Sequence, residues 1–194
     1  MQPYAKSLLT ATVLLLSVGS WAQEVYHFNG PDLLARLSYD SSPVVQRDGV
    51  RHVCVAVSHD GDYRIVRSLN SGQAQRLQGK IPQEQFQQLK TLLGSADFRA
   101  LSGSHGGLIF QESESFAAEI PMRGWQRESA TQRLQWLNAN GESPFPDSVA
   151  KVVDWLKHFE PTDGKLFVYA EYPDVCPSGR LRLLQPSVAD NLHP

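Results

Sequence analysis

The stretch Val50–Leu93 constrains the fold more than any other part of the chain. It begins with two runs rich in β-branched residues that meet at Asp60-Gly61. Asp-Gly between alternating apolar residues indicates a β-hairpin, because a type I′ turn needs positive φ at both central positions. A two-residue turn at this point pairs Val55 with Val66 across the hairpin. The pairing predicts one apolar face made of Val53, Val55, Val57 and Val66.

The segment after the hairpin has the pattern of a capped amphipathic helix. Pro82 suits the first helical position, where its missing N–H costs nothing. Glu84 lies in the first turn, where the helix dipole favours an anion, and Gly94 is placed to end the helix. The apolar stripe consists of Phe86, Leu89 and Leu93. A hairpin with a valine face and a helix with a leucine face predict a two-layer core.

The second half of the chain repeats this order of elements. Residues 108–121 and 133–141 have strand-like patterns, and a helix is predicted between Pro146 and Pro161. The stripe of that helix, Val149, Val152 and Leu156, has the same spacing as the stripe of the first helix. We therefore expect an α+β fold, in which an antiparallel sheet of hairpins packs on two amphipathic helices. A duplicated β-β-α unit would explain the repeat, and a chance likeness between two helices is the alternative.

The N-terminus has the three parts of a secretory signal peptide. Lys6 supplies the positive charge, Leu8–Val18 the apolar region, and Ser20-Trp21-Ala22 places small residues at −3 and −1 of a cleavage site. The apolar run is shorter than the roughly 20 residues that span a bilayer. We expect residues 1–22 to be removed by cleavage after Ala22 and the mature protein to be secreted or periplasmic. A buried N-terminal helix is the alternative.

The predicted signal peptide leaves a mature chain at residues 23–194. We expect it to form a single domain with pseudo-repeat halves at 33–101 and 108–160. A C-terminal hairpin extension is predicted at 161–186.

Two cysteines, Cys54 and Cys176, are present. In an exported chain such a pair favours a disulfide, which would join the C-terminal extension to the central hairpin. The alternative is that Cys54 is a small core residue and Cys176 is incidental. Metal binding is disfavoured because no cluster of histidines accompanies the pair.

Composition excludes several classes of partner. The chain is 41% hydrophobic and 20% charged, and its formal charge is −2. The charges are spread along the sequence, so there is no footprint for nucleic acid or for an anionic membrane. No cofactor is expected, because the sequence has no phosphate-binding loop and no dinucleotide fingerprint.

Three groups of residues are candidates for catalysis or metal binding. Ser104-His105 lies between glycines, but adjacent residues cannot align a serine on its own imidazole, so Ser102–Gly107 is predicted to be a flexible loop. The other two groups are His59, Asp60 and Asp62 in the hairpin turn, and Glu112, Glu114 and Glu119 in a strand-like run. The turn lacks the oxygen series of a calcium loop. The glutamates are the pattern of a solvated strand face, although paired carboxylates also run glycoside hydrolysis.

Several core motifs together resemble a bacterial group of small exported domains. They are Pro82, Leu92-Leu93, Ala96-Asp97-Phe98 and Trp155-Leu156. Over residues 33–160 the chain resembles the strand–strand–helix domains of emfourin-like proteins. The resemblance implies an α+β interaction domain, and emfourin itself inhibits thermolysin-like metalloproteases. The chain departs from that pattern in its predicted signal peptide, longer loops and the cysteine-bearing extension after Pro161, and no functional residue is carried over.

These observations favour an exported, non-enzymatic domain that binds a protein or a small ligand, with protease inhibition as one form of that function. The alternatives are a small secreted hydrolase, which would bring a histidine and an acid together beside a nucleophile, and a structural component of the cell envelope. The sequence does not indicate an oligomeric state.

Overall fold

The computed structural model describes residues 32–42, 49–69, 74–107, 112–122, 131–161, 164–167 and 175–177. Within these ranges eight strands form one mostly antiparallel sheet, in the order β5-β7-β6-β1-β2-β3-β4-β8. The strands are β1 (Leu33–Ser41), β2 (Val50–Ser58), β3 (Asp62–Leu69), β4 (Ala74–Lys80), β5 (Gly103–Gly106), β6 (Ser113–Pro121), β7 (Thr131–Ala139) and β8 (Lys165–Leu166). The expected α+β class is confirmed.

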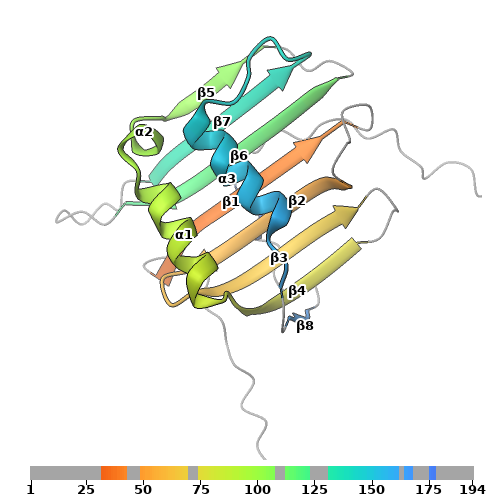
Figure 1. The fold of residues 1–194 in the computed structure, drawn as a ribbon, viewed down its shortest axis with the longest axis vertical. Coiled ribbons are helices and arrows are strands. Elements are labelled where there is room, and N and C mark those ends of the chain that lie inside the picture. Colours follow the sequence, from red (N-terminus) through yellow and green to blue (C-terminus); the bar gives the residue numbers. More distant parts are fainter. Residues whose placement is uncertain are drawn as a thin grey trace, which may run out of the picture.

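The helices α1 (Gln83–Gly94) and α3 (Asp147–His158) lie on one face of the sheet (Figure 1). A proline precedes each helix as its N-cap residue, so Pro82 lies one position before the first helical position predicted for it, and each helix has an acidic residue in its first turn. Trp155 joins the two helices, because its indole N–H donates to the carbonyl oxygen of Gln85 at 3.3 Å. A short helix, α2 (Ala96–Arg99), places Phe98 in the core.

The main core lies between the helices and the sheet. It takes alternate residues of the central strands, so that Leu37 of β1 pairs with Val55 of β2 and with Ala118 of β6. Alternation of side chains along a strand sends the intervening residues to the other face. That second face carries small and polar groups, among them Ser38, Ser115 and Cys54, all of which are buried.

The central hairpin differs from its prediction by one residue of register. Val55 pairs with Ile65, and Val66 pairs with Cys54. Val66 therefore lies on the face away from the helices, and Ile65 takes the place in the main core that was predicted for Val66. The cause is the turn, which has three residues and ends in Gly61 at φ 84°. A type I turn followed by a left-handed glycine adds one residue to the loop, and a slip of one residue exchanges the faces.

The predicted flexible loop at Ser102–Gly107 is instead the edge strand β5, which pairs in parallel with β7. Gly106 is required there: it has φ 99°, and a Cβ atom at this position would lie 2.0 Å from the carbonyl oxygen of Leu137. β5 is thus held by a close backbone contact. Its sequence has no alternation of apolar residues, which is the pattern by which a strand is predicted.

Several predictions fall outside the described residues. They include the signal peptide at 1–22 and most of the extension at 161–186, of which residues 161, 164–167 and 175–177 are described. Among the described residues, no helix is both long and apolar enough to cross a bilayer.

Candidate functional site

The predicted disulfide is confirmed: Cys54 and Cys176 are bonded across a sequence separation of 122. Cys54 belongs to β2 and is fully buried, whereas Cys176 is half-buried. The bond lies on the sheet face away from the helices. A second, smaller apolar cluster surrounds it, made of Leu33, Ala56, Val66, Phe167 and Val175.

A histidine and an acid accompany the disulfide. Asp40 of β1 is the cross-strand partner of His52 in β2. The Nδ1 of His52 lies 2.8 Å from Oδ1 of Asp40, and both side chains are nearly buried. His52 precedes Cys54 by two positions, so both side chains leave the same face of the strand. A ring nitrogen of His52 and the sulfurs of Cys54 and Cys176 lie within 4.8 Å of one another.

An acid, a histidine and a cysteine are the parts of a nucleophilic site, but in this group both cysteines are oxidised to a disulfide. A cysteine acts as a nucleophile when it is a thiolate. Here each sulfur is bonded to the other, so the cluster in its oxidised form joins residues 175–177 to the sheet. Its remaining chemistry is thiol–disulfide exchange or, after reduction, metal ligation.

A cavity of about 480 Å³ opens on the other face, beside the end of α3. Its polar part carries Arg67, Lys157, His158 and Glu160, so potential cations outnumber the single acid. Its apolar walls are Val50, Leu69, Leu77 and Pro161, and Gln75 completes the lining.

Two of the cavity cations are fixed by protein contacts. The guanidinium of Arg67 donates to the carbonyl oxygens of Leu156, at 3.3 Å, and of Phe159. Burial lowers the pKa of Arg67, and the negative charge of Glu160 opposes that shift. The Nζ of Lys157 lies 3.7 Å from Oε1 of Glu114.

Tyr39 completes this network. Its hydroxyl donates to the same oxygen of Glu114, and the ammonium of Lys157 lies 4.6 Å from the centre of its ring. The cavity is therefore lined partly by residues that are held in place before any ligand arrives.

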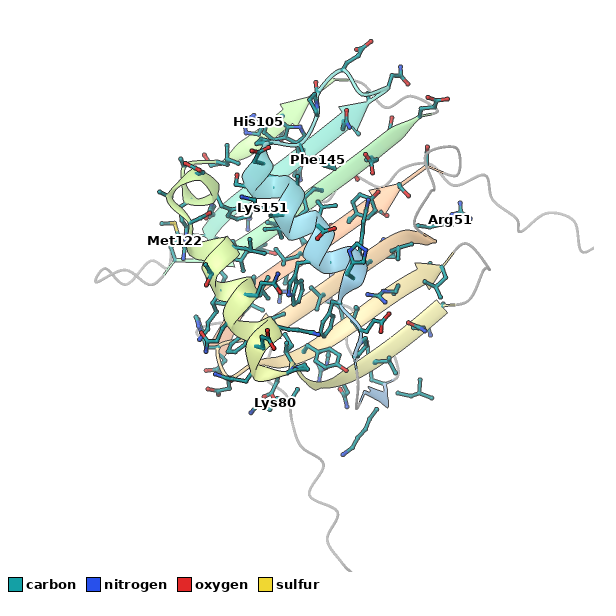
Figure 2. The ribbon with its side chains drawn as sticks, in the orientation of Figure 1. Arg51, Lys80, His105, Met122, Phe145 and Lys151 are labelled. Atoms are coloured by element: carbon teal, nitrogen blue, oxygen red, sulfur yellow. A yellow bond between two sulfur atoms is a disulfide. The ribbon has the colours of Figure 1, made fainter. Side chains whose placement is uncertain are left out.

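The structure does not align Ser104 on His105. The Oγ of Ser104 is 3.2 Å from Oε1 of Gln135. The His105 ring stacks on Trp136 with centroids 4.6 Å apart, and its Nε2 lies 2.8 Å from the carbonyl oxygen of Ser102. Figure 2 places His105 at the β5 edge of the sheet. These contacts fix an edge strand.

The hairpin residues considered for metal binding belong to the turn itself. The hydroxyl oxygen of Ser58 accepts from the backbone N–H groups of Asp60, at 3.2 Å, and Asp62, at 3.0 Å. The carboxylate of Asp62 lies 3.9 Å from Nζ of Lys80.

The three glutamates do not form one group. Glu112 is exposed and precedes β6, while Glu114 faces the helices with Tyr39. Glu119 lies on the opposite face, 3.4 Å from Arg36 and 3.7 Å from Arg133. The prediction of a single solvated face was wrong for Glu119, which is 8% exposed. Its position on a central strand, next to β1, accounts for this burial.

Sequence reasoning missed the pairing of Asp40 with His52 and the buried Arg67. A polar residue at position 40 gives no sign of its cross-strand partner. The alternation of β3 placed Arg67 on the valine face only once the correct register was known.

No known protein-family model matches this chain, and no curated protein matches it either.

Proposed function

We propose that this chain is an exported, non-enzymatic binding domain whose ligand occupies the cavity at the end of α3. One observation carries the proposal: a cavity of about 480 Å³ in which Arg67, Lys157 and His158 adjoin an apolar wall. This volume is within the range of small-molecule sites, which combine apolar walls with a few fixed polar groups. The disulfide and the predicted signal peptide support the export part of the proposal.

The chemistry of the lining selects a ligand class. Two fixed cations and a histidine favour a carboxylate, and the aliphatic walls favour an apolar group next to it. A carboxylate with an apolar group next to it is present in an aliphatic carboxylic acid and in an acidic or C-terminal segment of a protein partner. A flat apolar docking surface has less support. Among the described residues, the large apolar side chains that are exposed are Met122 and Leu166. Figure 2 shows Met122 at the margin of the sheet.

A pair of isosteric substitutions tests the cavity. Gln75→Glu adds a negative charge to the lining, whereas Gln88→Glu adds the same charge to the helix groove formed by α1 and α3. Titration calorimetry with hexanoate should show binding to the parent chain and to Gln88→Glu, and several-fold weaker binding to Gln75→Glu. The same three proteins, immobilised, should differ in the same order when they capture a partner from culture supernatant or periplasmic extract. Equal binding by all three would contradict the proposal.

A second candidate function is inhibition of a thermolysin-like metalloprotease. It is favoured by two strand–strand–helix runs in the order that the emfourin resemblance implies, β3-β4-α1 and β6-β7-α3. An inhibition assay against thermolysin, with Gln75→Glu and Gln88→Glu alongside the parent chain, tests it directly. Absence of inhibition at micromolar protein would exclude it.

The proposed duplication rests on the order of strands. The order β5-β7-β6-β1-β2-β3-β4-β8 is symmetric about the boundary between β1 and β2, so that β6 corresponds to β3 and β7 to β4. After α1 the chain crosses to pair β5 with β7, and after α3 it crosses to pair β8 with β4. The correspondence is incomplete, because β5 is parallel to its neighbour and β8 is antiparallel.

A further inference from the structure

The sheet face away from the helices brings together three side chains that can bind a metal ion. One ring nitrogen of His52 and the sulfurs of Cys54 and Cys176 lie within 4.8 Å of one another. We propose that reduction of the Cys54–Cys176 disulfide converts this group into a Zn²⁺ site. The inference goes beyond the proposed function, because the cavity at the end of α3 lies on the opposite face of the sheet.

The donor set suits zinc. Two thiolates and one imidazole are ligands that Zn²⁺ prefers, and three protein ligands leave a fourth tetrahedral position for water or another group. With Zn–S bonds of about 2.3 Å, tetrahedral geometry separates the two sulfurs by about 3.8 Å. The sulfurs therefore need to move apart by less than 2 Å after reduction, and the nitrogen already lies within 4.8 Å of both.

Asp40 acts as a positioning residue for this site. Its Oδ1 lies 2.8 Å from Nδ1 of His52, so the imidazole presents Nε2 as the nitrogen that would coordinate. A carboxylate that accepts from the second nitrogen of a metal-binding histidine fixes the tautomer and the orientation of the ring. Both residues are nearly buried, at 13% and 12% side-chain exposure, which restricts their rotation.

The surroundings favour a bound cation once thiolates form. Cys54 is fully buried and packs with Leu33, Ala56 and Val66. A thiolate in such an apolar setting is costly unless a positive charge compensates it. Two thiolates balance the charge of Zn²⁺, and the half-buried Cys176 provides the approach for reductant and metal.

The change of state involves two balanced steps. A dithiol transfers two electrons and two protons to the S–S bond, which yields the thiols of Cys54 and Cys176 and leaves the dithiol as its own disulfide. Zn²⁺ then displaces the two thiol protons and binds both sulfurs and the imidazole. The disulfide and the metal site thus exclude one another.

Co²⁺ tests the site, because its thiolate charge-transfer bands report sulfur ligation and its visible bands report tetrahedral geometry. The purified chain is reduced with excess dithiothreitol, freed of reductant under argon and titrated with Co²⁺, followed by competition with Zn²⁺. We expect one Co²⁺ per chain with both sets of bands, displacement by Zn²⁺, and no bands with the oxidised protein.

Matched variants separate this site from loose binding to thiols. His52→Ala should remove the tetrahedral bands, and Asp40→Asn should weaken Zn²⁺ binding by about 10–100-fold. His105→Ala removes a histidine elsewhere on the sheet and should leave the titration unchanged. Identical titrations of His52→Ala and the parent chain would overturn the proposal.

Circular dichroism, recorded in the same titration, shows whether the chain unfolds when the disulfide is reduced. If the reduced chain unfolds, Zn²⁺ should restore the spectrum of the parent chain and fail to do so for His52→Ala, since metal binding then supplies folding free energy. A reduced chain that neither binds Co²⁺ nor refolds with Zn²⁺ would also overturn the proposal.

Discussion

Arg67 donates a hydrogen bond to the carbonyl oxygen of Phe159, although the two residues are 92 positions apart in the sequence. The same guanidinium group binds the carbonyl oxygen of Leu156 in the last turn of α3. The final carbonyls of a helix have no partner within the helix, so a cation at that end satisfies them and interacts well with the dipole. Arg67 therefore fixes the end of α3 to the sheet.

Replacement of Arg67 by methionine should destabilise the protein by about 2–4 kcal/mol, because it leaves buried carbonyl oxygens without a donor. Urea denaturation followed by circular dichroism measures the change. Arg133→Met is the control: the Arg133 side chain is 67% exposed, and its ion pair with Glu119 should contribute less than about 1 kcal/mol. Equal losses in the two variants would contradict the assigned role.

The cost of Arg67→Met should not depend on pH near neutrality. Burial lowers the pKa of Arg67 below its ordinary value, with Glu160 acting in the opposite direction. The native state therefore releases this proton before the unfolded state does, and stability gains from it with rising pH only between the two pKa values. An arginine side chain stays protonated near neutrality, so this gain lies outside the neutral range. Denaturation at about pH 6 and about pH 9 should give the same difference between Arg67→Met and the parent chain.

Removal of the disulfide should be costly as well. The double variant Cys54→Ala, Cys176→Ala opens a loop with a sequence separation of 122, and loss of a native disulfide typically costs about 2–5 kcal/mol. Urea denaturation in the presence of a metal chelator compares this variant with the reduced and the oxidised parent chain. The variant and the reduced parent should have similar midpoints, both below that of the oxidised chain. A midpoint unchanged from the oxidised chain would show that the bond does not stabilise the fold.

Two glycines of β5 form a matched pair. Gly103 and Gly106 have φ of 84° and 99°, but a Cβ atom at Gly103 meets nothing within 4 Å, whereas at Gly106 it lies 2.0 Å from the oxygen of Leu137. Gly103→Ala should cost about 1–2 kcal/mol through backbone strain, and Gly106→Ala should in addition separate β5 from β7. Hydrogen exchange of the amides at 103–106 and 134–137 measures this. Equal protection in both variants would contradict the contact.

The turn between β2 and β3 depends on a serine side chain. Ser58→Ala removes the acceptor for the N–H groups of Asp60 and Asp62 and should cost about 1 kcal/mol. Ser68→Ala is the control, because Ser68 lies at the other end of β3. Urea denaturation should rank Ser58→Ala as the less stable variant.

This turn also shows how far the sequence alone leads. Asp60-Gly61 located the hairpin correctly, because glycine tolerates positive φ. The number of residues in the loop is set by the hydrogen bonds of Ser58, and the alternation of β3 is compatible with either register, since Ile65 and Val66 are both apolar. The hairpin was thus predictable and its faces were not.

The helices and the disulfide could be predicted from the sequence, whereas the His52–Asp40 pair and the lining of the cavity could not. A proline, an acidic first turn and a regular stripe locate α1 and α3, because these signals are local. The pairing of His52 with Asp40 depends on the register of β1 against β2. The lining of the cavity depends on the approach of α3 to β3 and β4, which no local pattern contains.

The position of β1 in the sheet has a consequence for the chain while it is being synthesised. Arg36 on β1 bonds Glu119 on β6, 83 residues later. At a synthesis rate of about 5–20 residues per second, roughly 4–17 s separate the two. During this interval one edge of β1 has no partner strand, and an open edge of this kind invites pairing with other chains. A newly made chain is therefore open to pairing with other chains along residues 33–41 until β6 emerges.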